Sequence, residues 1–271
     1  MKVLVLSMLD EKDQYVYDYT EKMASKMDLS VHVLNIVPVP ADVPLQADGR
    51  VLDNCTEFDL SGYLEQQLEN QLVLANLGMT YETASSIVGR PMPIIEAYVK
   101  ANNIDLIISV AEISSGVKSL FTTTLSSQII KEIGIPYLTL KCDRSWEEIQ
   151  RIGLVGDFKH AEKRNLSVLK QLQKAFKAAF YLFTINTSND FQSETDAKRN
   201  MEEFARINGL SDVSYYIYSA KDKKSGIINI IVEYKINLMA LGMVGHKGIF
   251  GDFKREVVNE VATPLFTYSK N

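Results

Sequence analysis

Four glycines follow an apolar run within ten residues in the second half of the chain, in the stretch ALGMVGHKGIFGDF (240–253). They are Gly242, Gly245, Gly248 and Gly251, and a helix-like run comes after them. A glycine loop between a strand and a helix can bind phosphate, because uncovered backbone N–H groups approach the anion at the helix N-terminus. The spacing therefore predicts a loop with the form of a phosphate-binding loop.

Asp252 directly follows the last of these glycines. Its side chain is expected to cap the next helix by accepting a hydrogen bond from a free backbone N–H. Two like charges ~4 Å apart repel by about 1 kcal/mol in water, and by several kcal/mol at an effective dielectric constant near 20. His246 and Lys247 could offset this repulsion, although basic residues at a loop tip are more often simply solvated. The loop is expected to have the form of a phosphate loop without its affinity.

The chain carries no organised catalytic or metal-binding motif such as HExxH, GxSxG or GxxxxGK[ST]. Asp157 and His160 are spaced to share one helical turn, but no serine or cysteine nucleophile accompanies them in the context of a triad. The basic stretch AKDKKSG (220–226) could contact phosphate, although a solvated loop is the stronger interpretation. We therefore predict no enzymatic activity and no bound metal.

Composition argues against several classes of function. The 271 residues carry a formal net charge of −5, so no general basic field recruits nucleic acid or an anionic membrane. No run approaches the roughly eighteen apolar residues of a membrane span, and the N-terminal MKVLVLSMLDEKD is interpreted as a first strand rather than a signal peptide. Cys55 and Cys142 lie far apart and outside any CxxC motif, which favours a reduced, cytoplasmic setting.

Short aliphatic runs recur in the same order in the two halves of the chain, which indicates an internal repeat. The matching pairs are KVLVLSMLDEKD (2–13) with RIGLVGDFKHAE (151–162), IDLIISVAE (104–112) with INLMALGMV (236–244), and EIGIPYLTLK (132–141) with EVATPLFTYS (260–269). We therefore predict a first domain over residues 1–142, a linker over 143–150 and a second domain over 151–271.

Each copy alternates strands with helices, which predicts an α/β fold with a parallel, doubly wound sheet. The expected strands are 3–7, 30–37, 80–88, 105–111 and 136–141, then 152–155, 180–185, 213–218, 238–241 and 265–268. The expected helices are 11–26, 60–77, 93–101 and 125–132, then 161–176, 194–207, 226–234 and 252–261. Ligands of such sheets bind outside the carboxyl ends of the strands, where the glycine loop falls.

The first copy is longer than the second, and the extra residues are placed in VPVPADVPLQADGRVLDNC (37–55). Its prolines make a regular strand unexpected there. An inserted surface loop is the favoured interpretation, and a partner-binding arm is the alternative.

With this order of elements the chain resembles a tandem universal stress protein of the UspA-like family. The resemblance implies two Rossmann-like units of the adenine nucleotide alpha hydrolase type, each a five-stranded parallel sheet with helices on both faces. Family members that keep the pattern G-x2-G-x9-G-[S/T] resemble ATP binders. Two units normally pair side by side, so a tandem chain is expected to form that pair as an intramolecular pseudo-dimer.

The second copy keeps part of the family's nucleotide site. Its loop reads G-x2-G-x5-G-D, with Gly242 and Gly245 at the first two glycines and Gly251 and Asp252 in place of Gly-[S/T]. The loop is thus four residues shorter and has a carboxylate instead of a hydroxyl. The resemblance implies further ligand contacts, which would come from Asp157, Ile185 and Leu241. For Asp157, a helix cap is an equally strong interpretation.

The first copy keeps the spacing but not the residues of the family pattern. Val110 and Ile113 stand where the two glycines belong, and β-branched residues do not readily adopt the backbone of such a loop. Thr123 and Thr124 supply hydroxyls, but they also make good helix caps. Met8 replaces the aspartate, so no nucleotide site is expected in this copy.

The sequence leaves three hypotheses of function. The first is a stress-response protein that acts by binding, with weak or absent ATP binding in the second domain; its ligand would be a nucleotide, another small molecule or an unidentified protein partner. The second is an interaction scaffold without a small ligand, and the third is a slow nucleotide hydrolase. The apolar fifth strands could also pair two chains into a homodimer, unless the two strands of one chain already pair with each other.

Overall fold

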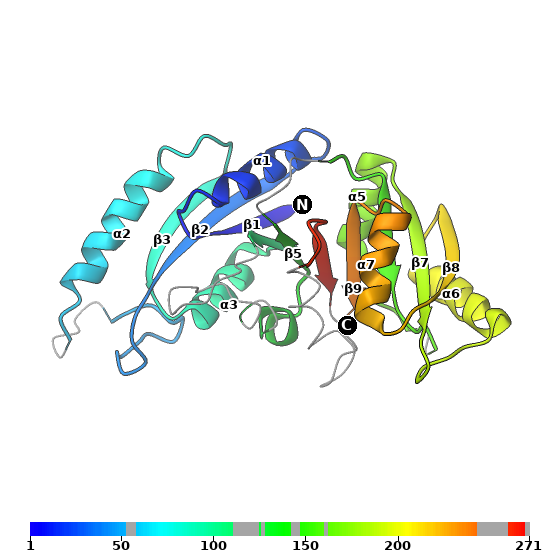
Figure 1. Ribbon diagram of the computed structural model, residues 1–271. Coiled ribbons are helices and arrows are strands. Elements are labelled where there is room, and N and C mark those ends of the chain that lie inside the picture. Colours follow the sequence, from blue (N-terminus) through cyan, green and yellow to red (C-terminus); the bar gives the residue numbers. More distant parts are fainter. Residues whose placement is uncertain are drawn as a thin grey trace. The chain divides into compact units, whose positions relative to one another are not determined.

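The computed structural model describes residues 1–52, 58–110, 125, 128–141, 147–159, 162–242 and 260–268. Contacts within the chain divide it into two units, Met1–Ile135 and Pro136–Asn271, which are described separately (Figure 1). The domain boundary that the sequence indicated, Cys142–Gln150, remains a prediction, and part of it lies outside the described residues.

The first unit contains four parallel strands in the order β3-β2-β1-β4. Each lies where the sequence predicted a strand, with ends that differ by at most three residues. The predicted helix 125–132 corresponds to a π-helical turn, η1, and to helical residues at 125 and 128. The elements are β1 (Lys2–Ser7), α1 (Asp13–Ala24), β2 (Ser30–Pro38), α2 (Ser61–Leu74), β3 (Thr83–Gly89), α3 (Pro91–Asn102), β4 (Leu106–Val110) and η1 (Ile129–Ile133).

The second unit contains five parallel strands in the order β10-β9-β6-β7-β8, with β5 antiparallel to β10 at the end of this series. The fifth strands of the two sequence copies, β5 and β10, therefore pair with each other. The elements are β5 (Tyr137–Leu140), β6 (Arg151–Val155), α5 (Ser167–Phe176), β7 (Ala179–Asn186), α6 (Glu194–Asn208), β8 (Val213–Ser219), α7 (Lys223–Glu233), β9 (Leu238–Gly242) and β10 (Leu265–Tyr268). The predicted helix 252–261 lies almost entirely outside the described residues.

Helix α5 begins at Ser167, so the prediction of a helix from residue 161 was wrong in its first turns. The backbone before α5 is instead bound by Asn208, at the C-terminus of α6. Asn208 accepts a hydrogen bond from the N–H of Arg164 (2.7 Å) and donates one to the carbonyl of Glu162 (3.0 Å). These hydrogen bonds hold the described residues before α5 in a non-helical conformation. The helical periodicity of the sequence does not reveal such contacts.

The strands next to the point where the strand order reverses are buried along their length, as parallel strands flanked by helices should be. In the first unit these are β1 and β4, and in the second β6 and β9. Because chain connections leave the sheet in opposite directions on the two sides of this point, the carboxyl ends of the two strands border a crevice suited to ligands.

The proline-rich insertion in the first unit is hydrogen-bonded along the carboxyl end of β3. The N–H of Val51 donates to the carbonyl of Val88 (3.2 Å), and the N–H of Arg90 donates to the carbonyl of Gly49 (3.0 Å). Gly49 has a φ of +85°, and a Cβ there would lie 2.6 Å from Cβ of Pro93 in α3. The described part of the insertion is thus an ordered loop on the surface of this unit, and glycine at 49 permits its close approach to α3.

Helix α2 directs polar side chains at the sheet and leaves apolar ones exposed. Gln67 donates to the carbonyl of Ser86 (2.8 Å), while Gln71 donates to the carbonyl of Ala84 (3.0 Å) and accepts from the N–H of Ser86 (2.9 Å). β3 is the outer strand of its series, so these amides satisfy backbone groups that have no neighbouring strand. The exposed apolar side chains of α2 are Leu64, Leu68, Leu72 and Val73.

Candidate functional site

Four of the seven predicted site residues lie at one edge of the second unit, at the carboxyl ends of adjacent strands. Val155 at the end of β6 pairs with Leu241 of β9 on one side and with Phe183 of β7 on the other. Asp157, two residues after Val155, is therefore level with Ile185, and Gly242 is the last residue of β9. The other three predicted residues, Gly245, Gly251 and Asp252, lie outside the described residues.

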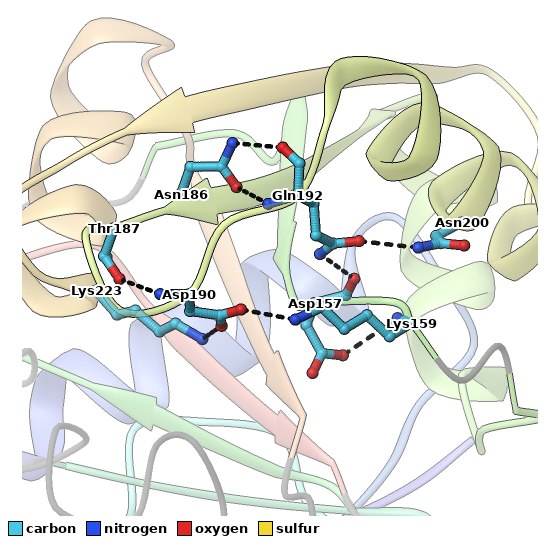
Figure 2. Close-up of polar contacts among 8 residues, drawn as sticks. All are labelled: Asp157, Lys159, Asn186, Thr187, Asp190, Gln192, Asn200 and Lys223. Atoms are coloured by element: carbon cyan, nitrogen blue, oxygen red, sulfur yellow. Dashed lines mark hydrogen bonds and ion pairs between the residues drawn. The ribbon is translucent and has the colours of Figure 1, made fainter.

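Asp157 belongs to a tight loop after β6 and does not cap a helix, since α5 begins ten residues later. The next residue, Phe158, has a φ of 51° and is buried against Phe204, with ring centroids 4.9 Å apart. This anchor fixes the direction of the loop. The carbonyl of Asp157 accepts a hydrogen bond from Nε2 of Gln192 (2.8 Å), and its carboxylate accepts one from the N–H of Lys159 (3.4 Å) (Figure 2).

Gln192 is the centre of a buried amide network that covers the end of β7. Its backbone exchanges two hydrogen bonds with the side chain of Asn186, of 3.0 and 2.9 Å. Its Oε1 accepts from Nδ2 of Asn200 in α6 (2.8 Å), while its Nε2 reaches Asp157 as described. Figure 2 shows these side chains converging between β7 and α6. The network therefore holds the connection between β7 and α6 against the loop that carries Asp157.

Asp190 lies in the same connection, and its carboxylate is bound by two ammonium groups. Nζ of Lys159 is 2.7 Å from Oδ1, and Nζ of Lys223 is 2.5 Å from Oδ2. The hydrogen bonds from the two lysines hold the pKa of Asp190 below its usual value, and the same contact raises the pKa of Lys159. Thr187 closes the turn through hydrogen bonds to the backbone of Asp190. The connection is thus attached at once to the β6 loop and to α7.

Helix α7 brings Lys223 to this edge because it begins there. Asp222 is its N-cap and accepts a hydrogen bond from the N–H of Ser225 (2.8 Å). One residue further on, Gly226 faces Ile185: a Cβ at 226 would lie 2.9 Å from Cγ2 of that side chain. Ile185, the residue expected beside a nucleotide base, is therefore packed under α7 and only 4% exposed.

Little space remains among these groups. The cavity beside Asp157 and Ile185 has a volume of about 10 Å³, close to the minimum that holds one water molecule. Pockets for small organic ligands have volumes of roughly 300 Å³ or more, so this cavity among the described residues is too small to hold an adenine base by itself. The residues that line the cavity are Val155, Gly156, Asp157, Thr184, Ile185, Asp190, Gln192 and Lys223.

One of the lining residues carries a buried hydroxyl without a partner. Oγ1 of Thr184 makes no hydrogen bond within the described part of the chain, and Thr184 is 2% exposed. Most buried polar groups in proteins are hydrogen-bonded. The cavity is therefore small, and its lining residues include one with an unsatisfied hydroxyl, Thr184, and three that carry charge, Asp157, Asp190 and Lys223.

Gly242 has a packing reason for being glycine. A Cβ there would lie 3.0 Å from the hydroxyl oxygen of Tyr268 and 3.1 Å from the ring carbon that bears it. Tyr268 is buried in β10, and burial raises the pKa of its hydroxyl to about 12. The glycine that the sequence suggested for phosphate approach is thus also closely packed against the neighbouring strand, where a Cβ would require Tyr268 to shift.

In the first unit the corresponding sheet edge contains a buried hydrogen-bonded cluster. Oγ of Ser7 lies 2.7 Å from both a carboxylate oxygen of Asp13 and the hydroxyl of Tyr17, and the same carboxylate oxygen accepts from the N–H of Leu9 (2.7 Å). Burial raises the pKa of Asp13 to about 6. Val110, at the end of β4, is buried, whereas Ile113, Thr123 and Thr124 lie outside the described residues.

The described residues contain neither a candidate metal-binding cluster nor a membrane-spanning helix. No group of three or more His, Cys, Asp or Glu side chains there could hold a metal ion. No helix in this part of the chain is long and apolar enough to cross a membrane.

Sequence reasoning missed Asp190 and Gln192 and gave Lys223 only a weak role. Lys223 belongs to the basic stretch 220–226, for which a solvated loop was the stronger interpretation. Its side chain is only 18% exposed and it pairs with Asp190, so that interpretation was wrong for Lys223. No signal in the sequence linked it to Asp190, since the two residues lie on different connections and meet only through the fold.

The whole chain is similar to several solved structures. A universal stress protein from Archaeoglobus fulgidus is 16% identical, with a TM-score of 0.63, over 100% of this chain and 96% of its own. A protein from Pseudomonas aeruginosa assigned to the universal stress class is 16% identical, with a TM-score of 0.59, over 99% and 93%. The cytoplasmic domain of a prokaryotic cation chloride cotransporter is 9% identical, with a TM-score of 0.50, over 98% and 94%. No family model and no curated protein matches the sequence.

Proposed function

We propose that this protein acts by binding rather than by catalysis. The proposal starts from its fold, which is the tandem fold of universal stress proteins. In this proposal it is a protein of the universal stress class, and its second unit binds ATP weakly or not at all. The site would be the sheet edge that carries Asp157, Ile185, Leu241 and Gly242. Gly245, Gly251 and Asp252 would contribute from the glycine loop.

The observation that supports weak binding is the size of the cavity beside Asp157 and Ile185, about 10 Å³. For a base to enter this cavity, the connection that carries Asp190 and Gln192 would have to move away. Such a movement would break the two ion pairs of Asp190 and the amide network of Gln192. The free energy needed for that opening reduces the binding free energy of any nucleotide, and so weakens its apparent affinity.

The experiment is a calorimetric titration of the purified full chain with ATP and Mg²⁺, after mass spectrometry has tested for nucleotide carried through purification. We expect no carried nucleotide and a dissociation constant above about 0.1 mM, which corresponds to less than about 5.5 kcal/mol of binding free energy. One site per chain with a micromolar constant would contradict the proposal.

A pair of variants tests whether the cavity is the barrier. Gln192→Ala removes the amide that ties the connection to Asp157, so it should lower the cost of opening and tighten ATP binding. Gln173→Ala is the control, because Gln173 donates to the carbonyl of Ser211, just before the amino end of β8, whereas the site lies at the carboxyl ends of the strands. Equal affinities for both variants and the unmodified chain would place the barrier elsewhere, for instance in the shortened glycine loop.

The second candidate function is an interaction scaffold without a small ligand, and the exposed face of α2 favours it. Leu68 and Leu72 are both 68% exposed, whereas helices at a protein surface usually turn such side chains to the core. Glu65 and Glu69 lie beside them and α2 contains no basic residue, so a partner with an apolar, basic surface would suit this face. If ATP failed to bind even the Gln192→Ala variant, this function would become the stronger one.

A further inference from the structure

The two lysines that hold Asp190 come from separate parts of the second unit. Lys159 follows β6, and Lys223 is the first residue of α7. Each ammonium contacts a different oxygen of the carboxylate, at 2.7 Å and 2.5 Å. The arrangement surrounds one small anionic group from two sides (Figure 2). An oxyanion of another molecule presents its oxygens in the same way.

Thr184 provides an independent indication of a ligand. Thr184 lines the same cavity as Asp190 and Lys223, and its buried hydroxyl has no hydrogen-bond partner within the described residues. Leaving a buried hydroxyl unpaired is unfavourable, so a ligand oxygen that reached it would gain a hydrogen bond that the chain alone does not supply.

The balance of charge at the cavity favours a multiply charged anion once Asp190 has moved. A single carboxylate, that of Asp157, would then remain for the two ammonium groups: Lys223 lines the cavity together with Asp157, and the Lys159 ammonium interacts electrostatically with Asp157. A phosphate group carries more negative charge than the carboxylate it would replace, and lysine binds phosphate as a point charge without a fixed geometry. The carboxylate of Asp190 carries only one negative charge, and Asp190 belongs to a turn that Thr187 closes.

We propose that Lys159, Lys223 and Thr184 form a subsite for a phosphate or pyrophosphate group, and that Asp190 occupies this subsite in the absence of ligand. The carboxylate of Asp190 is an internal competitor for the two ammonium groups. This inference rests on the proposed function, since it concerns the same sheet edge, and it adds the chemistry of the ligand and the group that opposes binding.

The test is titration of the full chain with inorganic pyrophosphate in the absence of magnesium. Asp190→Asn keeps the shape of the side chain but removes its charge, so we expect at least a tenfold gain in affinity over the unmodified chain. The double variant Asp190→Asn with Lys223→Gln should lose this gain. Glu203→Gln is the matched control: it removes one negative charge from an exposed ion pair with Arg206 in the same unit, and should change affinity less than twofold.

The proposal is overturned if Asp190→Asn gains no more than Glu203→Gln, or if the double variant keeps the gain. If Asp190→Asn does not fold, the proposal can still be tested with the unmodified chain. Pyrophosphate at tens of millimolar should then shift nuclear magnetic resonance signals of the unmodified chain around Asp190 and Thr184, and Lys223→Gln should abolish these shifts. Equal shifts in both proteins would also overturn the proposal.

ATP in the same Asp190→Asn variant separates this inference from the proposed function. If ATP binds more tightly than pyrophosphate, the base contributes and the ligand is a nucleotide. If the two bind equally, the subsite takes a free phosphate group, and the nucleotide part of the proposed function fails while the subsite stands.

Discussion

A Cβ on Gly226 would lie 2.9 Å from Cγ2 of Ile185, so α7 approaches β7 at a distance that only glycine accommodates without a shift. This contact positions the first turn of α7, and with it Lys223, at the sheet edge. It also fills the space between Ile185 and α7, beside the residue for which the family resemblance predicts contact with a base. The close contact between Gly226 and the Ile185 side chain therefore affects both where the Lys223 ammonium lies and how much space remains in the candidate site.

Gly226→Ala should destabilise the second unit, because overpacking of a filled core costs about 1–3 kcal/mol, more than the gain of up to about 1 kcal/mol from helix propensity. Gly62→Ala in α2 is the control, since a Cβ there meets nothing within 4 Å, and it should be neutral or stabilising. The urea unfolding midpoint should fall for Gly226→Ala and should stay the same or rise for Gly62→Ala. A stabilised Gly226→Ala would contradict the close packing.

Asp13→Asn should stabilise the first unit at neutral pH. The folded pKa of Asp13 is about 6, raised by burial from 3.8, so stability from this group is present below pH 3.8 and is lost as pH rises towards 6. Asparagine is neutral throughout and can still accept from Ser7 and the N–H of Leu9. As the pH rises from 4 to 7, the midpoint temperature of thermal unfolding should fall more steeply for the unmodified chain than for Asp13→Asn. Identical slopes for both proteins would show that Asp13 is not perturbed.

The reversed orientation of α2 predicts that the glutamines facing the sheet matter more to folding than the exposed leucines of this helix. Gln67→Ala should destabilise the first unit by about 1 kcal/mol, because it removes the hydrogen bond to the carbonyl of Ser86. Leu68→Gln, at a side chain that is 68% exposed, should change stability by less than about 0.5 kcal/mol. Chemical unfolding of the two variants measures this difference. The opposite ranking would mean that α2 buries its leucine face.

Gly242 and Tyr268 should be energetically coupled. Gly242→Ala places a Cβ about 3.0 Å from the tyrosine hydroxyl, so the ring must shift, and we expect a loss of about 1 kcal/mol. In a Tyr268→Phe background the same substitution should cost less, since the hydroxyl is gone. A double-mutant cycle measures the coupling. Additive effects would exclude this contact as the reason for glycine at 242.

The sequence by itself determined the elements that surround the site. Aliphatic runs in a repeated order predicted the described strands closely, because burial on both faces of a parallel strand requires such runs. The same periodicity placed Asp157, Ile185 and Leu241 at carboxyl ends of strands, and parallel strands bring these ends to one edge of the sheet. The nomination of these residues as ligand contacts remains a prediction.

Only the tertiary structure decided what occupies that edge. Asp190 and Lys223 are 33 residues apart on different connections, and their contact depends on how far α7 approaches β7 at Gly226. The start of α5 at Ser167 and the outward leucines of α2 depend likewise on Asn208 and on the unpaired edge of β3. Local periodicity records which residues favour a helix or a strand, whereas these features arise from hydrogen bonds and close contacts between segments distant in the sequence, which periodicity does not encode.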